Sequence, residues 1–550
     1  MTYKELADLI FPEAKDVAFY EEKYPARNLE EGAMVTRFAP SPTGFMHIGG
    51  LFGAIVDRKL AKQSNGVFIL RIEDTDQKRE IENGIDMIVN SLKDFGIEPD
   101  EGMISETDEI GQYGPYKQSE RKEIYQAYAK SLIEKGLAYP CFCSPEEIEE
   151  IREKQEQAKI RPGYYGIWAK CRNLNLEEMA EKIRKGEKYI VRFKSQGRED
   201  RKIKHKDVIK GNIDFPENDQ DIVIIKADGL PTYHFAHAVD DHLMRVTHVI
   251  RGDEWVSSIP LHLELFRALG FNPPKYAHTA TIMKDENGSK RKISKRKDPE
   301  AAVSFYHEEG IPKEAVVEYL LNIANSSFEP WRRGNPNKDI SEFELQLNKM
   351  SISGAVFDMT KLLDVSKNII CKFSAQRVFD EAFKWAERYD KELENLLKED
   401  KEYSLKVLGI ERENVKPRKD ISKWSEIKNA ISYMYNSEYE KIEDFEFQKI
   451  NDKKEISHII KSYVEKHFDI NDDKETWFNK IKDLSEEFGY AREVKEYKQE
   501  PEKYKGHVGD VSTVLRIALT GRCNTPDLYE IMQVLGEKTV IERLQKFYGI

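Results

Sequence analysis

The stretch MVTRFAPSPTGFMHIGG, residues 34–50, decides the fold class of this chain. Its first part, VTRFAP, contains β-branched and aromatic residues and runs into Pro40, which predicts a short strand. From His47 onward, apolar residues recur at helical spacing, namely Ile48, Leu51, Phe52, Ile55, Val56 and Leu60. The pattern therefore predicts a strand, a loop and a helix in succession.

The loop APSPTG between the predicted strand and helix is stiff. Pro40 and Pro42 each fix φ and have no N–H group, and they push the residues before them, such as Ser41, towards extended conformations. The loop follows the carboxyl end of a strand, which is where ligands bind in open α/β sheets. Helix N-termini favour phosphate, and His47 could donate to it, although a lone histidine at such a place is more often a cap or a solvated residue.

The segments that follow extend the α/β pattern. GVFILRIED (66–74) predicts a strand and GIDMIVNSLKDFGI (84–97) a helix, so the order indicates a parallel βαβ unit. Residues of about 141–225 change character, with three cysteines, a charged helix and separate strands, which indicates an inserted domain. The α/β pattern resumes with THVIRGDEW, and beyond about residue 300 the periodicity is helical.

Bulk properties exclude some classes of protein. No run of about 18 apolar residues is present, so we expect no membrane span. The acidic, mixed N-terminus lacks the features of a secretory signal, and five cysteines suit a reducing compartment better than a disulfide framework. We therefore expect a cytoplasmic protein. A net charge of −12 does not exclude nucleic acid, because binding requires only a local basic surface.

The stretch GSKRKISKRK, residues 288–297, is a second candidate for phosphate binding. It can be interpreted as a basic surface patch or as a mobile loop that brings Lys292 and Lys295 onto a triphosphate. The chain has no G-x-x-x-x-G-K-[ST] motif and no G-x-G-x-x-G after the first strand, so any phosphate is bound by another device.

Considered together, the two stretches resemble a known class of enzyme. HIGG (47–50) is similar to the HIGH motif of class I aminoacyl-tRNA synthetases, and KISKR (292–296) is similar to their KMSKS motif. The motif's last histidine is Gly50 here, a change also found among glutamyl enzymes. RFAPSPTGFMHIGG, LRIEDTD (70–76), GLPTYHFAHAVDDHLM (229–244) and HVIRGDEW resemble glutamyl-tRNA synthetases of the bacterial type, and LRIALTG and DLYEIMQVLG resemble their C-terminal region.

The resemblance covers residues 34–550 and implies a multidomain chain. It implies a Rossmann-like class I catalytic domain at 34–300, in which an α+β insertion at about 141–225 binds the tRNA acceptor end. An all-α C-terminal half follows, with a helical connecting region at 301–375 and an anticodon-binding region at 376–550. Residues 1–33 are a short helical extension that the resemblance does not explain.

The resemblance also implies a reaction and its partners. The chain would form glutamyl-adenylate from L-glutamate and ATP with Mg²⁺, then transfer glutamate to tRNA(Glu), with activation requiring bound tRNA. We expect a monomer. His47, Gly49 and Lys295 would bind the ATP phosphates, with Lys292 in support, because the step needs positioning and charge stabilisation.

The same resemblance implies a glutamate pocket. Arg37 and Arg251 would bind the two carboxylates, since a guanidinium can grip a carboxylate with two N–H groups. Glu73 would take the ammonium, and Ser41 and Tyr233 would complete the pocket. Singly, each residue has a plainer interpretation: Arg37 as an exposed strand residue, Glu73 as a surface acid paired with Arg71, and Tyr233 as core. A departure from many relatives is His237, which affects the expected shape of the pocket.

Three cysteines, Cys141, Cys143 and Cys171, are similar to a zinc site in some members of the family. Zinc usually takes four ligands, and the sequence offers no clear fourth, because Asn173 stands where some relatives have histidine. Tyr164 and Tyr165 lie nearby, but not at the expected spacing. Both a zinc site and a metal-free reduced group stay open. We expect Cys371 and Cys523 to be buried small apolar residues.

Two other functions compete with the main interpretation. A tRNA-modifying paralogue would attach glutamate to a modified base, but such proteins lack the anticodon-binding half, and the helical region after about residue 375 argues against it. A non-catalytic RNA-binding protein derived from a synthetase would not need the residues His47, Lys295, Arg37, Glu73 and Arg251, all of which are present.

Overall fold

The computed structural model describes residues 1–76, 80–294 and 296–549. Lys295, one of the residues predicted to bind phosphate, lies outside the described residues. The chain forms two compact units, the first made of Met1–Phe305 and Val317–Asp358 and the second of Tyr306–Val316 and Met359–Ile550. The four-part division expected from the sequence is finer than these two units.

Parallel strands form the centre of the first unit. Strands β1 (Val35–Phe38), β2 (Val67–Leu70) and β3 (Glu101–Met103) pair in parallel, and β4 (Glu109–Ile110) adds an antiparallel edge. A second parallel pair, β10 (His248–Gly252) and β11 (Lys275–Thr279), joins at β1, where the Thr247 N–H donates to the Val35 carbonyl at 3.0 Å. The predicted parallel βαβ unit is confirmed.

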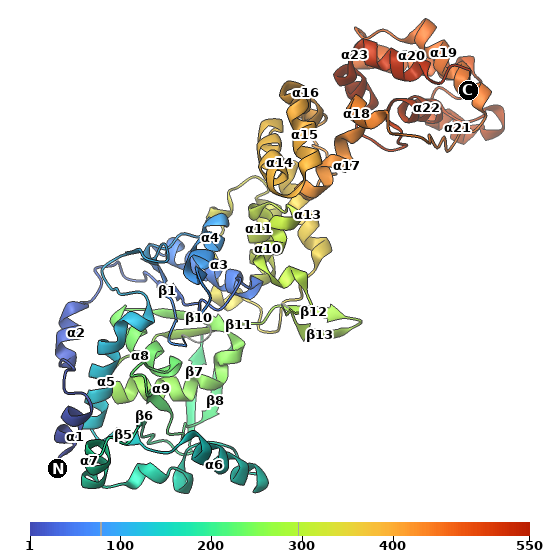
Figure 1. The fold of residues 1–550 in the computed structure, drawn as a ribbon. Coiled ribbons are helices and arrows are strands. Elements are labelled where there is room, and N and C mark those ends of the chain that lie inside the picture. Colours follow the sequence, from blue (N-terminus) through green and yellow to red (C-terminus); the bar gives the residue numbers. More distant parts are fainter. Residues whose placement is uncertain (77–79, 295, 550) are drawn as a thin grey trace. The chain divides into compact units, whose positions relative to one another are not determined.

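Helices cover the strands on both sides. In Figure 1, α3 (Ile48–Gln63) and α4 (Gly84–Asp94) lie above β1 and β10, and below them lie α5 (Lys122–Glu134), α8 (Tyr233–Leu243) and α9 (Ile259–Leu269). Phe68, Ile69 and Leu70 of β2 are fully buried, as expected for a strand with helices on both faces. The carboxyl ends of β1 and β10 therefore lie at one edge of a covered sheet, and this edge carries Arg37 and Arg251.

A close backbone approach explains one glycine of the sheet. Gly102 of β3 has φ +125°, and a Cβ atom there would lie 2.1 Å from the Leu70 carbonyl oxygen. A larger residue would force β3 away from β2, so the pairing requires glycine.

The segment between α5 and α8 is antiparallel, in contrast to the parallel core. Strands β5 (Ala138–Cys141), β6 (Ile190–Phe193) and β9 (Val223–Ile225) form one sheet, and β7 (Lys202–Asp207) pairs with β8 (Gly211–Pro216) as a hairpin. Helices α6 (Pro145–Gln157) and α7 (Leu176–Arg184) accompany them. The predicted α+β character of the insertion is confirmed.

The N-terminal extension is helical, as predicted. Helices α1 (Tyr3–Ile10) and α2 (Val17–Lys23) lie beside α5 (Figure 1). Beyond them, the Tyr24 hydroxyl donates to the Gly114 carbonyl at 2.8 Å, and Arg27 binds both carboxylate oxygens of Glu101 at 2.7 and 2.8 Å. These contacts fasten the extension to the first unit.

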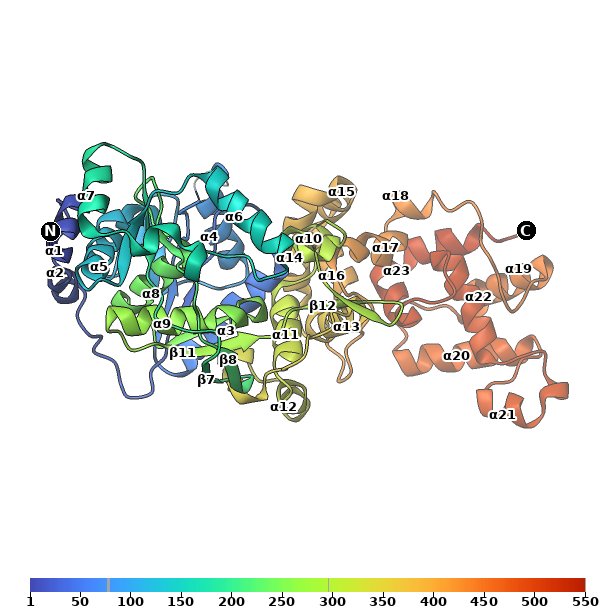
Figure 2. The same cartoon turned by 90° about the horizontal axis from the view of Figure 1, so that it is seen from below.

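The C-terminal part of the chain is helical throughout its described length. Its elements include α13 (Met359–Ile370), α14 (Ala375–Tyr389), α15 (Lys391–Glu399), α16 (Lys401–Gly409), α17 (Ile427–Ile431), α18 (Asn436–Tyr439), α19 (Lys453–Ser462), α20 (Lys474–Glu487), α21 (Val494–Gln499), α22 (Val508–Thr520) and α23 (Leu528–Gln545). Figure 2 shows α14–α16 gathered together and α19–α23 forming a further group. One hydrophobic cluster runs from Ile370 to Phe547.

Several elements lie near the boundary between the two units in the sequence. Helices α10 (Val303–Glu309) and α11 (Lys313–Ala324) contribute residues to both, and α12 (Phe328–Gly334) belongs to the first. A β-hairpin, β12 (Met283–Glu286) and β13 (Ser289–Lys292), carries the start of the basic stretch.

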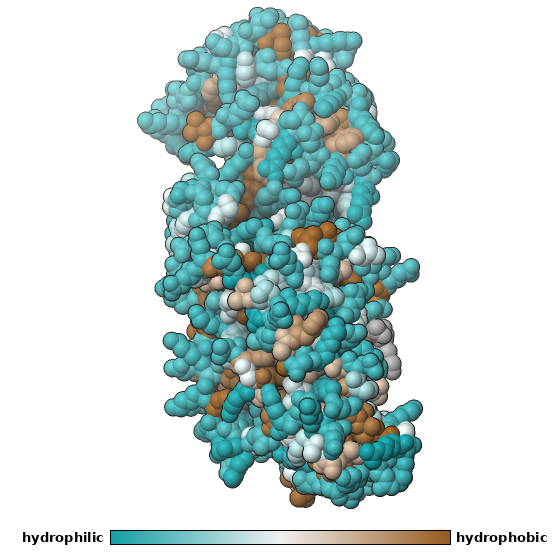
Figure 3. Space-filling view, turned by 90° about the vertical axis from the view of Figure 1, so that its left-hand side faces the viewer, coloured by the Kyte–Doolittle hydropathy of each residue, from teal (hydrophilic) through white to brown (hydrophobic). Residues whose placement is uncertain are grey.

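The face drawn in Figure 3 is largely hydrophilic, with small scattered hydrophobic patches. Within the described residues, every helix is too short or too polar to cross a bilayer.

Cys371 is buried as expected, but Cys523 is exposed, so its predicted burial is wrong. Cys523 lies in the loop after the C-terminal end of α22.

Candidate active site

The proline loop is held in place by the backbone. The N–H groups of Glu73 and Ile81 donate to the carbonyls of Pro40 and Pro42 at 3.0 and 3.1 Å, and Thr43 N–H donates to the Ser41 carbonyl at 2.8 Å. Because Pro40 and Pro42 have no N–H groups, they can be fixed by backbone hydrogen bonds only through their carbonyls. The loop is therefore rigid both by its own residues and by its partners.

His47 is the N-cap of α3. Its Nδ1 accepts a hydrogen bond from Gly49 N–H at 3.0 Å, so a neutral ring carries its proton on Nε2. The prediction that this histidine caps the helix is thus correct, and Nδ1 is the capping atom. The arrangement also orients the ring at the positive end of the helix, where an anion is favoured.

A cavity of about 630 Å³ opens at this edge of the sheet. Cavities of this size are typical of small-molecule sites. All the predicted site residues that the structure describes line it, from five separate segments of the chain: Arg37, Ser41, His47, Gly49, Glu73, Tyr233, Arg251 and Lys292. The structure thus brings the predicted residues together, whereas their roles stay predictions.

Arg37 belongs to a buried ion-pair network. Its Nε lies 3.3 Å from Oδ2 of Asp241, and Arg71 Nη1 lies 2.6 Å from Oδ1 of the same carboxylate. His237 Nδ1 lies 2.9 Å from Asp241 Oδ2. Burial disfavours a charged carboxylate, but Arg71 and Arg37 hold the pKa of Asp241 well below its usual range. The interpretation of Arg37 as an exposed strand residue is therefore wrong.

Glu73 is also a partner of Arg71, at 3.2 Å from Nη2. The plainer interpretation of Glu73 is therefore correct about its partner, Arg71. It is wrong about the surface position, because the side chain is only 9% exposed. Burial raises the pKa of Glu73, and the nearby Arg71 and Arg37 lower it only in part. A ligand ammonium in the cavity would favour the ionised form.

Arg251 has a different environment. Its Nε donates to His278 Nε2 at 3.0 Å, and Nη1 and Nη2 each lie 3.2 Å from His262 Nδ1. The guanidinium lies 4.8 Å from the centroid of the Tyr276 ring. No Asp or Glu among the described residues forms an ion pair with Arg251, although the residue is buried. Its positive charge therefore has no carboxylate partner among the residues that the structure describes.

Lys292 stands at the end of β13 and is largely exposed. Its Nζ lies 3.8 Å from Glu254 Oε1, a distance that leaves the ammonium only weakly held. The loop after it is anchored, because Ser294 N–H donates to Asp298 Oδ2 at 2.9 Å and Arg291 binds the same carboxylate. Lys295 follows Ser294 in the sequence and lies outside the described residues.

Two acids of α8 that bind buried arginines, Asp240 and Asp241, were not predicted from the sequence. Asp241 supports Arg37, and Asp240 accepts from Arg121, Gln118 and Tyr125 at 2.7–2.8 Å. The only local signal is the i, i+4 spacing of His237 and Asp241 on α8, because the arginine partners are more than one hundred residues away. Asp57, on α3, was also missed: it lines the cavity, and its Oδ1 has no partner among the described groups.

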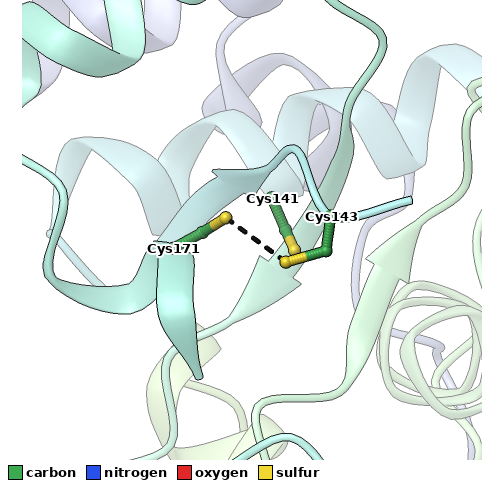
Figure 4. A group of neighbouring side chains, drawn as sticks. All are labelled: Cys141, Cys143 and Cys171. Atoms are coloured by element: carbon green, nitrogen blue, oxygen red, sulfur yellow. Dashed lines mark hydrogen bonds between the residues drawn. The ribbon is translucent and has the colours of Figure 1, made fainter. Parts of the chain in front are cut away.

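The three cysteines of the insertion lie together (Figure 4). Their Sγ atoms are within 4.8 Å of one another, with Cys143 and Cys171 3.7 Å apart. The Tyr164 hydroxyl lies 3.4 Å from Cys141 Sγ and 3.3 Å from Cys143 Sγ. The group thus has a fourth polar donor that the sequence spacing did not indicate.

Comparison with known families defines the class. A profile of "tRNA synthetases class I (E and Q), catalytic domain" matches residues 33–363, and a profile named "Anticodon binding domain" matches residues 391–548. The chain belongs to this family of class I tRNA synthetases, and the predicted fold class and family resemblance are both confirmed.

Several relatives that are similar to this chain over nearly its whole length are glutamate–tRNA ligases. The chain is 52% identical to a glutamate–tRNA ligase of Clostridium perfringens (strain SM101 / Type A) over 100% of both chains, and 52% identical to that of Acetivibrio thermocellus over 99% and 100%. It is similar to the crystal structure of a glutamate tRNA ligase from Elizabethkingia meningosepticum in complex with its amino acid, at 28% identity and a TM-score of 0.76. That match covers 94% of this chain and 99% of the other.

Proposed function

We propose that this protein is a glutamate–tRNA ligase whose cavity joins L-glutamate to ATP and then to tRNA(Glu). Family membership and full-length relatives of that name support the ligase activity. The observation that carries the site is the single cavity lined by Arg37, Glu73, Arg251 and His47. ATP enters as its Mg²⁺ complex, and we propose that the enzyme works as a monomer in the cytosol.

The first step needs no covalent nucleophile from the protein. An oxygen of the α-carboxylate of glutamate attacks the α-phosphorus, a new O–P bond forms, and the bond to pyrophosphate breaks. His47 at the start of α3 and the lysines Lys292 and Lys295 stabilise charge on the phosphates. The rigid proline loop keeps the glutamate carboxylate in line with the α-phosphorus of ATP. Correct positioning of the two reacting groups lowers the activation barrier.

The second step transfers the amino acid to tRNA. A hydroxyl of the terminal ribose attacks the acyl carbon of glutamyl-adenylate, and AMP leaves. We propose that residues 141–225 hold the acceptor end and that residues 376–550 contact the anticodon loop, in line with the matched anticodon-binding profile. The match also argues against the tRNA-modifying paralogue, which lacks that half.

Selectivity for glutamate follows from charge. Glutamate carries two carboxylates and one ammonium, and the cavity has two arginines and Glu73. An uncharged amide in place of the side-chain carboxylate would leave an arginine without its counter-charge, which is costly in a buried site.

ATP–pyrophosphate exchange tests the proposal. We expect glutamate-dependent exchange in the presence of tRNA(Glu) and little without it. Lys295→Ala should abolish exchange and leave tRNA binding largely intact, while Lys290→Ala, an exposed lysine of the same stretch, should keep activity. Absence of glutamate-dependent exchange with cognate tRNA would overturn the assignment. Charging of tRNA(Glu) and tRNA(Gln) side by side determines the tRNA specificity.

We propose further that the cysteine group of the insertion holds zinc. The residues fit three of the four positions that a structural zinc site requires, since Cys141, Cys143 and Cys171 can each supply a thiolate. The Tyr164 hydroxyl lies at hydrogen-bond distance from two of the sulfurs and would orient them. Zinc there would fasten β5 to the segment that carries Cys171. Purified protein should contain about one zinc per chain, and Cys171→Ser should lose it while Cys523→Ser keeps it. Equal zinc content in the two variants would contradict the site.

A further inference from the structure

Arg251 and His278 stand opposite each other in the parallel pairing of β10 and β11. His278 Nε2 accepts the hydrogen bond from Arg251 Nε at 3.0 Å, and on the other side of the ring Nδ1 lies 2.6 Å from Asp207 Oδ2. All three side chains are buried, at 8% exposure or less. The three groups form a line that ends at the cavity.

We propose that His278, oriented by Asp207, is a positioning residue that holds Arg251 in place for a substrate carboxylate without neutralising its charge. The inference rests on the proposed function, because it assigns Arg251 to glutamate. His278 does not line the cavity and acts through Arg251.

The hydrogen bonds determine the tautomer of His278. An arginine Nε always carries a proton, so His278 Nε2 must offer its lone pair, and the ring proton must be on Nδ1, facing Asp207. Asp207 also accepts the backbone N–H groups of Ile209 and Lys210 at 2.9 and 2.8 Å, which fixes the carboxylate. Burial lowers the pKa of His278, which favours the neutral ring that this arrangement needs.

A neutral acceptor has an advantage over a carboxylate at this place. A carboxylate on Arg251 Nε would compensate the guanidinium charge, as Asp241 does for Arg37. An imidazole fixes the orientation and leaves the full charge for the ligand. The charge of a substrate carboxylate then meets a pre-oriented, uncompensated arginine, which strengthens binding in a buried site.

Asp207 comes from the inserted segment. It is the last residue of β7, and the N–H of the next residue, Val208, donates to the Tyr276 carbonyl of β11 at 2.9 Å. The hairpin of the insertion is thereby tied to the strand that carries His278. The orientation of Arg251 thus depends on an element outside the parallel sheet.

Two amide substitutions separate positioning from packing. His278→Gln can place an acceptor near the position of Nε2, whereas His278→Asn can reach Asp207 but not Arg251. We expect His278→Asn to raise the KM for glutamate about ten-fold or more, as for a lost hydrogen bond to a charged group, with the KM for ATP unchanged. His278→Gln should stay within about three-fold of the parent, and Asp207→Asn should behave like His278→Asn.

A double-mutant cycle keeps the test valid if a variant is less stable. If His278 acts through Arg251, His278→Asn should add little to the effect of Arg251→Lys on glutamate KM. Equal effects of the Asn and Gln variants, a parallel change in ATP KM, or full additivity in the cycle would each overturn the proposal. Those outcomes are distinct from failure of the proposed function, which would remove glutamate-dependent exchange from the parent enzyme.

Discussion

The two arginines of the cavity, Arg37 and Arg251, lie at the ends of neighbouring parallel strands but in opposite electrostatic surroundings. Arg37 shares the carboxylate of Asp241 with Arg71, so its charge is partly compensated within the protein. Arg251 is fixed by two imidazoles and an aromatic ring, and no described carboxylate pairs with it. Similar burial and the same residue type thus produce one arginine that has a protein carboxylate as a partner and one that has no described carboxylate partner. The two cavity arginines therefore differ in how much uncompensated charge they offer a ligand.

The difference indicates how a buried pocket can bind an anion. A buried cation needs partners, but a partner of opposite charge reduces its attraction for a ligand. Neutral acceptors provide hydrogen bonds without that loss. We therefore expect substitutions on the Arg37 side to affect mainly stability and substitutions on the Arg251 side to affect mainly glutamate binding.

The largest effect on stability should come from Asp241→Asn. The change leaves Arg71 and Arg37 buried without their shared counter-charge, and breaking a buried pair from one side costs about 3–5 kcal/mol. Urea denaturation measures the free energy of unfolding. A loss below about 1 kcal/mol would show that the network is not a structural unit.

Arg251→Lys should come next, and its effect should be on catalysis. The charge is kept but the planar guanidinium is lost, so kcat/KM for glutamate should fall roughly 30- to 150-fold. This corresponds to a loss of about 2–3 kcal/mol of transition-state stabilisation. The free energy of unfolding should change less. Arg27→Lys is the matched control, because Arg27 also makes a two-fold contact, to Glu101, but outside the cavity. A loss of glutamate activity in that control would contradict the comparison.

Sequence patterns predicted the local features of this site well. The strand, the proline loop and the helix at His47 follow from neighbouring residues, and family motifs placed Arg37, Glu73 and Arg251 on one cavity. The framework was not predictable in the same way. Asp241 and Arg71 are 170 residues apart, and only the folded sheet brings them into contact.

The surroundings of Tyr164 and Cys523 were also not predictable from neighbouring residues. Tyr164 reaches the cysteine group through the path of its loop, which no spacing rule describes. Cys523 is exposed because it lies in a loop after α22, although free cysteines are among the most buried residues on average. Single-residue tendencies fail where the path of a loop decides the environment.

The buried acid Asp57 provides a smaller test on the Arg37 side. Burial raises the pKa of Asp57 well above its usual value, and Arg37 offsets this only in part. An acid whose pKa is raised by folding makes the folded state less stable as pH rises above the unfolded pKa of about 4, by up to about 1.4 kcal/mol per pH unit. The cost is complete above the folded pKa.

Asp57→Asn removes this titrating group. The variant should therefore gain stability relative to the parent as pH rises from 4, measured as the difference in the free energy of unfolding across the pH range. A difference that shrinks with rising pH would mean that the network keeps Asp57 ionised. Glu21→Gln is a useful control, because the pKa of Glu21 is lowered, with Tyr128 and His242 as partners that oppose the effect of burial. That variant should lose stability relative to the parent as pH rises towards the unfolded glutamate pKa of about 4.3, and the difference should stay level above it.

The smallest effect should come from an exposed ion pair. Arg198 binds both carboxylate oxygens of Asp200 at 2.9 and 2.6 Å, the shorter as close as the 2.6 Å contact of Arg71 with Asp241. Both side chains of the exposed pair are more than 60% exposed. Water screens the pair and solvates either partner alone. Arg198→Ala should therefore produce no resolvable change in Tm, whereas Asp241→Asn produces a large one. If both variants lost stability equally, close contact rather than burial would set the cost, and the contrast between Arg37 and Arg251 would no longer follow from desolvation.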